Sequence, residues 1–116
     1  MNTWRHDILL PETGDDKAYI RLRQPNNSEW KIMLRVQKDM VKFETDSDAA
    51  CDALSSFCDL LKTLIVDHNI EEAGKKLSSK EIADYINGDI MLTSRVLNEY
   101  YHALPLMNAS STTSGK

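Results

Sequence analysis

A chain of 116 residues with 41% hydrophobic and 28% charged residues suits one globular domain with a single modest core. The net charge is −4, and basic residues alternate with acidic or apolar ones, which argues against the basic stripe of a nucleic-acid-binding protein. No window approaches the roughly 18 apolar residues of a membrane span, and the N-terminus offers no signal peptide, so we expect a cytoplasmic protein without a membrane partner.

The segment from Leu10 to Gly14 reads LPETG, the recognition sequence of sortase transpeptidases. A sorting signal stands near the end of an exported chain, ahead of an apolar stretch and a basic tail. Here Asp15 and Asp16 follow instead. We therefore interpret the segment as a Pro-Gly loop within an irregular lead-in over residues 1–17, ahead of a strand.

A β-hairpin is predicted over residues 18–44. The sequence AYIRLR has strand character, and Gln24 to Glu29 is rich in turn formers. Four apolar residues then alternate with their neighbours, a period of two that favours a second strand: Trp30, Ile32, Leu34 and Val36. An amphipathic helix is the competing interpretation, with one face formed by Met33, Val36, Met40 and Phe43.

Three helices are expected after Thr45. The first covers residues 47–67, because TDSD resembles a helix start and nine apolar residues share half of the helical wheel: Ala50, Ala53, Leu54, Phe57, Cys58, Leu60, Leu61, Leu64 and Ile65. A capping box, SSKE, opens the second over residues 79–87, and Asn87-Gly88 ends it. The third, over 90–104, follows Asp89 and stops before Pro105.

We therefore predict an α+β fold: an N-terminal β-hairpin followed by about three amphipathic helices, in one domain over residues 1–106. The remaining residues, 107–116, are small and polar, and we expect a disordered tail there.

The third helix carries two apolar stripes. One consists of Ile90, Leu97, Tyr101 and Leu104, and the other of Leu92, Val96, Tyr100 and Ala103. Together they cover around half of the helix, more than the roughly 100° that one-sided packing needs. Either the helix is buried between two neighbours, or the second stripe contacts a partner chain. The candidate partner-binding residues are Leu92, Val96 and Tyr100.

Residues that could carry out catalysis are not grouped in this sequence. The acidic residues fall on polar helix faces or in turns, and no glycine-rich phosphate loop is present. Cys51 and Cys58 are about 10.5 Å apart along a helix, too far for a disulfide, and the histidines share no metal-ligand spacing with them. We expect a protein that is not an enzyme and binds no cofactor or metal.

The order of elements, with the turn-rich RLRQPNNSEW, resembles the tail assembly chaperones of long-tailed bacteriophages. The final SGK is similar to the Gly-Lys pair at which such chaperones shift reading frame, although a tag remnant would give the same Gly115-Lys116 ending. The resemblance implies a non-catalytic role: coating the helical tape measure protein and bringing tail tube subunits to it in the host cytoplasm. Leu92, Val96 and Tyr100 are then the expected contact surface. A homo-oligomer is left open.

The alternative from another class is a small phage or bacterial inhibitor or adaptor of the anti-defence type, acting by protein–protein binding through its charged face. A net charge of −4 is small for nucleic-acid mimicry. A small hydrolase or transferase would need a cleft that the sequence does not specify.

Overall fold

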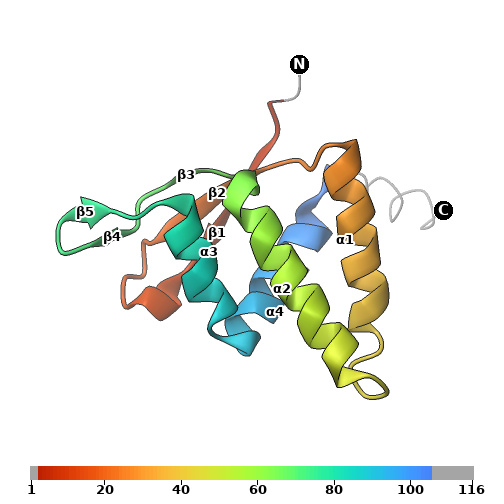
Figure 1. Ribbon diagram of the computed structural model, residues 1–116. Coiled ribbons are helices and arrows are strands. Elements are labelled where there is room, and N and C mark those ends of the chain that lie inside the picture. Colours follow the sequence, from red (N-terminus) through yellow and green to blue (C-terminus); the bar gives the residue numbers. More distant parts are fainter. Residues whose placement is uncertain (1–2, 106–116) are drawn as a thin grey trace.

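The computed structural model describes residues 3–105 and has an α+β fold. Helices lie against one face of a small antiparallel sheet, and a two-stranded hairpin projects at one end (Figure 1). The elements in chain order are β1 (Arg5–Leu9), a 3-10 helix η1 (Pro11–Thr13), β2 (Tyr19–Arg23), α1 (Asn27–Met40), α2 (Ser47–Leu64), β3 (Ile65–His68), β4 (Glu71–Glu72), β5 (Lys75–Lys76), α3 (Ser79–Asn87) and α4 (Ile90–Ala103). Among the described residues, no helix is both long and apolar enough to span a membrane.

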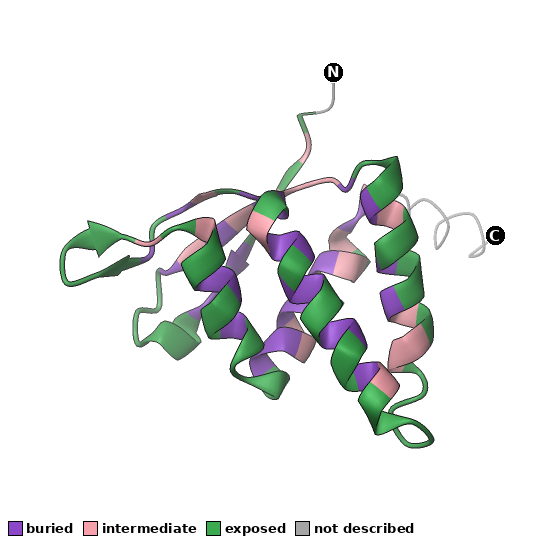
Figure 2. Ribbon diagram, viewed as in Figure 1, coloured by how far each residue is buried: buried purple, intermediate pink, exposed green. Residues whose placement is uncertain are grey.

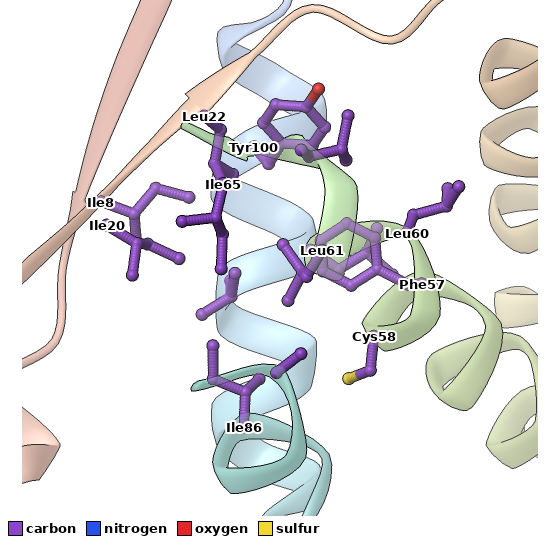
Figure 3. Close-up of a cluster of buried hydrophobic side chains, with 14 of the residues drawn as sticks. Ile8, Ile20, Leu22, Phe57, Cys58, Leu60, Leu61, Ile65, Ile86 and Tyr100 are labelled. Carbon is purple, nitrogen blue, oxygen red and sulfur yellow. The ribbon is translucent and has the colours of Figure 1, made fainter. Parts of the chain in front are cut away.

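The main sheet has the order β1-β2-β3, and both pairings are antiparallel. Ile8 lies opposite Ile20, and Leu22 lies opposite Ile65 beyond a register shift in β2. Because side chains alternate between the two faces of a strand, these four residues point to one side, where they are buried. Figure 3 shows them facing Phe57, Leu61 and Tyr100 from the helices.

The N-terminal hairpin is confirmed as a feature of the fold, but the predicted strands were wrong in part. Strand β2 pairs with β1, which lies in the segment predicted to be irregular, and residues 30–44 form no strand. Residues 27–40 are helix α1, the competing interpretation. The Asn26 side chain accepts a hydrogen bond from the Glu29 amide, and the Glu29 carboxylate accepts one from the Asn26 amide, so a capping box starts a helix there.

Helix α1 then continues because Met33 and Val36 bury one face against α2, with Met40 partly buried one turn later. Phe43, the fourth residue of the predicted helical face, lies beyond the helix end in the turn that leads to α2.

The other helices lie close to their predicted positions. Helix α2 ends at Leu64 rather than at residue 67, because Ile65 is extended and begins the strand that pairs with β2. All nine residues of its predicted apolar face are buried. Helix α3 has the predicted bounds and capping box, and α4 ends one residue before the predicted end. The predicted tail over 107–116, including Gly115-Lys116, lies outside the described residues.

The LPETG segment is a folded turn, as predicted. Pro11–Thr13 form η1, and Gly14 ends it with a positive φ of 95° that glycine adopts without strain. Arg95 of α4 donates two hydrogen bonds of 2.8 Å to the Glu12 carboxylate and one of 2.9 Å to the Leu9 carbonyl. The turn is therefore fixed to α4, and it leads into β2.

Candidate functional site

The predicted partner-binding residues of α4 lie inside the core. Leu92 is 3% exposed, and Val96 and Tyr100 are fully buried. Helix α4 packs against α2, α3 and β1, so its second apolar stripe is covered by this chain itself. The assignment of Leu92, Val96 and Tyr100 as a contact surface was therefore wrong for this fold, and the interpretation of a helix buried between neighbours holds.

Tyr100 has a structural role at the top of this core. Its ring lies 6.2 Å from that of Phe57, beside which Figure 3 shows it. Its hydroxyl donates a hydrogen bond of 2.6 Å to the Arg23 carbonyl of β2. Burial raises the pKa of the phenol above its usual range, because the anion would lose its hydration. Tyr100 therefore joins α4 to the sheet and is unavailable to a partner.

Exposed apolar side chains are concentrated elsewhere, above all on α1 and the turn after it. On α1, Ile32 is 36% and Leu34 is 54% exposed, and in the turn Val41 and Phe43 are also exposed. Figure 2 shows that the buried stripe of α1 is narrow beside that of α2. Other exposed apolar residues are scattered over the described surface: Leu9, Val66, Tyr85, Ile90 and Met91.

A groove runs between α1 and α2, which lie side by side in opposite directions (Figure 1). Its volume is about 550 Å³. We call it the α1–α2 groove, and its lining consists of the apolar Ile32, Val36, Ala53 and Leu60 and the polar Arg35, Asp39, Asp52, Ser56, Asp59 and Thr63. The groove thus combines apolar side chains with charged ones, three acidic and one basic.

A polar clamp holds the two walls of the groove together. Arg23 donates hydrogen bonds of 2.8 and 2.9 Å to the two Glu29 oxygens, and the Thr63 hydroxyl of α2 donates one of 3.0 Å to the same carboxylate. Mainly because of the Arg23 guanidinium, the pKa of Glu29 falls to about 2, so its carboxylate is charged at neutral pH. The clamp fixes the start of α1 to both β2 and α2.

Several titratable groups in the described residues are held in structural contacts. Burial raises the pKa of the Cys58 thiol to about 11, which keeps it protonated and poorly nucleophilic. The pKa values of Asp7 and Glu12 are lowered, first of all by hydrogen bonds from Arg21 and Arg95. Across residues 3–105, no three His, Cys, Asp or Glu side chains lie close enough together to hold a metal ion.

Each of the three histidines has a different contact. His6 Nε2 lies 3.6 Å from a Glu99 oxygen, beyond hydrogen-bond distance, and His102 Nδ1 lies 2.8 Å from the Asn98 carbonyl. His68 is buried, and its Nδ1 accepts a backbone N–H. None of these arrangements pairs a histidine with a nucleophile, the geometry that acyl transfer would require.

Part of the α1–α2 groove could be predicted from the sequence, although the sequence did not identify it as a groove. The wheel of the competing helix placed Met33 and Val36 on one face, and helical spacing would also have placed Ile32 beside that face. The capping residues Asn26 and Glu29 were the signal that could have decided between strand and helix. No family model, curated protein or solved structure matches the chain.

Proposed function

We propose that this protein is a non-catalytic binding protein of the tail assembly chaperone type, which shelters an apolar helical segment of a partner protein in the α1–α2 groove. The observation that supports this most directly is a groove that no described segment of this chain fills, with the exposed Ile32 on its wall and the apolar Val36, Ala53 and Leu60 in its lining. In this role the partner is the tape measure protein of a long-tailed phage, tail tube subunits join the complex, and the site of action is the host cytoplasm.

The position of the groove between two adjacent helices suits a third helix. Two adjacent helices leave a furrow between them into which the side-chain ridge of a third helix can pack. Ala53 and Ser56 are small, so an incoming helix can approach α2 closely. Ile32 on α1 and Leu60 on α2 offer apolar contacts on the two walls. A helix in a groove is bound through apolar residues that recur every three or four positions.

The rim of the groove suits the polar face of such a helix. Asp39 lies 3.4 Å from the ammonium of Lys42, and Asp59 lies 3.1 Å from that of Lys62. Asp52 has no ion pair among the described residues. Surface ion pairs of this kind contribute little and exchange partners readily. Charged residues beside the apolar stripe of a partner helix can therefore be accommodated without burying an unpaired charge.

Co-expression with an apolar helical fragment of a tape measure protein tests the proposal. The fragment alone is expected in the insoluble fraction, and with this protein it should move to the soluble fraction and coelute in size exclusion chromatography. Ile32→Glu should reduce recovery of the complex about tenfold or more, because a carboxylate replaces an apolar contact worth roughly 1.5–3 kcal/mol.

Leu34→Glu is the matched control, since Leu34 is an exposed apolar residue on the same helix but does not line the groove. It should leave recovery unchanged. The proposal fails if the fragment stays insoluble with the wild-type protein, or if both variants lose the complex equally.

A further inference from the structure

The β4–β5 hairpin and α3 lie at the opposite side of the molecule from α1 (Figure 1). A second groove lies between them. Its volume is about 630 Å³. We call it the hairpin groove, and its lining consists of the apolar or aromatic Ile70, Leu77, Ile82 and Tyr85, together with Thr13, Glu71, Glu72, Glu81 and Asp84. This groove shares no residue with the α1–α2 groove.

The hairpin that forms one wall contributes nothing to the main core. Its four strand residues are exposed, and its turn has positive φ at both Ala73 (53°) and Gly74 (81°), the pattern of a two-residue type I′ turn. Isolated two-stranded hairpins are only marginally stable. This one is secured at its base, where the Leu77 amide donates a hydrogen bond of 3.0 Å to the Ile70 carbonyl. The hairpin therefore extends the surface without adding to the core.

The charge of the hairpin groove is of one sign. Four carboxylates line it, and none of its lining residues is Lys or Arg. Glu81 accepts the Ser78 amide as part of the α3 capping box, and Asp84 lies 3.3 Å from Lys80. Glu71 and Glu72 have neither an ion pair nor a side-chain hydrogen bond among the described residues.

The lysines across the hairpin form no ion pair with these two glutamates. Glu71 is paired in register with Lys76, but the Lys76 ammonium lies 3.4 Å from Asp67 on β3. Glu72 is opposite Lys75, and no ion pair joins these two described residues. Two unpaired carboxylates thus border an apolar floor, on which Ile82 is buried and Tyr85 is about half-exposed.

We propose that the hairpin groove docks a basic segment of a partner protein, with an apolar side chain on Ile82 and Tyr85 and with Lys or Arg side chains at Glu71 and Glu72. Charge complementarity identifies the occupant, because acidic grooves attract cationic groups and raise their association rate. The apolar floor favours a peptide over a small cation, and the negative rim repels nucleic acid. This site is independent of the proposed α1–α2 function.

The test uses a short fluorescein-labelled peptide in which lysine pairs flank a single leucine, and anisotropy measures its affinity for the whole protein. Glu71→Lys with Glu72→Lys should weaken binding about tenfold or more. Raising the salt from roughly 0.02 M to 0.15 M should also weaken wild-type binding, because mobile ions screen the contact. Tyr85→Ala should weaken binding severalfold with little change in the salt dependence.

Asp16→Lys with Glu44→Lys is the matched control, because it changes the net charge equally and alters exposed residues outside both grooves. Its affinity should stay close to that of the wild type, and so should that of Ile32→Glu. Amide NMR shifts on peptide addition should map to Ile70, Leu77 and α3. Equal losses in the two double variants, absence of peptide binding, or shifts confined to α1 would each overturn the proposal.

Discussion

Helices α1 and α4 have the same length, 14 residues, but different contacts hold them in the fold. Helix α4 lies against α2, α3 and β1 and buries five residues among them. Helix α1 packs mainly on α2, buries three residues, and relies on the clamp between Glu29, Arg23 and Thr63.

The comparison shows that the width of an apolar stripe does not identify the helix that meets a partner. Helix α4 has the wider apolar stripe, most of which is buried in the core, with Ile90 and Met91 exposed at its start. Helix α1 has a narrower buried stripe, and Ile32 and Leu34 are exposed on it. What decides exposure is the number of neighbouring elements that the chain supplies, and α1 stands at the edge of the molecule (Figure 2).

Tyr100→Ala should have the largest effect on this comparison. It removes a fully buried aromatic ring and leaves the Arg23 carbonyl without its hydrogen bond, so the free energy of unfolding should fall by about 4 kcal/mol. Urea denaturation followed by circular dichroism measures the change. A loss below about 1 kcal/mol would show that Tyr100 is not part of the core. That result is the one expected of an exposed partner-binding residue.

Glu29→Gln should have the next largest effect, because it removes the charge on which the α1 clamp depends. The pKa of Glu29 falls from 4.5 to about 2 on folding, so the charged form contributes at most about 3 kcal/mol above pH 4.5. The sign follows from a lowered pKa: the contribution is complete above the unfolded value and is lost as the pH falls from 4.5 towards 2.

Urea denaturation between pH 7 and pH 2.5 measures the Glu29 effect. The wild type should approach the stability of Glu29→Gln as the pH falls, while Asp59→Asn, which breaks an exposed pair with Lys62, should change stability by less than about 0.5 kcal/mol. A constant difference between wild type and Glu29→Gln across this range would contradict the role of the charge.

Ile32→Glu and Leu34→Glu should have small effects on folding. Both residues are already exposed on α1, so each change should alter the free energy of unfolding by less than about 1 kcal/mol. Thermal melts of the isolated protein measure this. A large loss for Ile32→Glu would mean that the groove residue supports the fold, and a defect in partner binding could then not be assigned to the groove.

Local signals predicted the helical half of the fold well. Helix α3 has a capping box at one end and Asn87-Gly88 at the other, and the apolar face of α2 is long enough to define a helical period. These features act between residues close in the chain, so the sequence contains them directly.

The remaining errors concern α1, where a strand period competed with a local capping box, and β1, which depends on its partner strand. Trp30, Ile32 and Leu34 alternate as in a strand, while Met33 and Val36 have helical spacing, and the Glu29 clamp to Arg23 and Thr63 supports the helix. Strand β1 forms because it pairs with β2 across η1. The polar sequence of β1 does not predict this pairing.

The predicted contact surface on α4 and the hairpin groove also depend on residues that are distant in the chain. Burial of Leu92, Val96 and Tyr100 depends on α2, α3 and β1, which only the fold brings around α4. The hairpin groove joins Glu71 and Glu72 to Asp84 on α3, and no periodic pattern connects them along the chain.

Arg23 of β2 contacts both α1 and α4. Its guanidinium grips the first turn of α1 through Glu29, while its carbonyl receives the Tyr100 hydroxyl near the end of α4. Because one contact uses the Arg23 side chain and the other its backbone carbonyl, a shift of β2 at this residue would change the contacts of both helices.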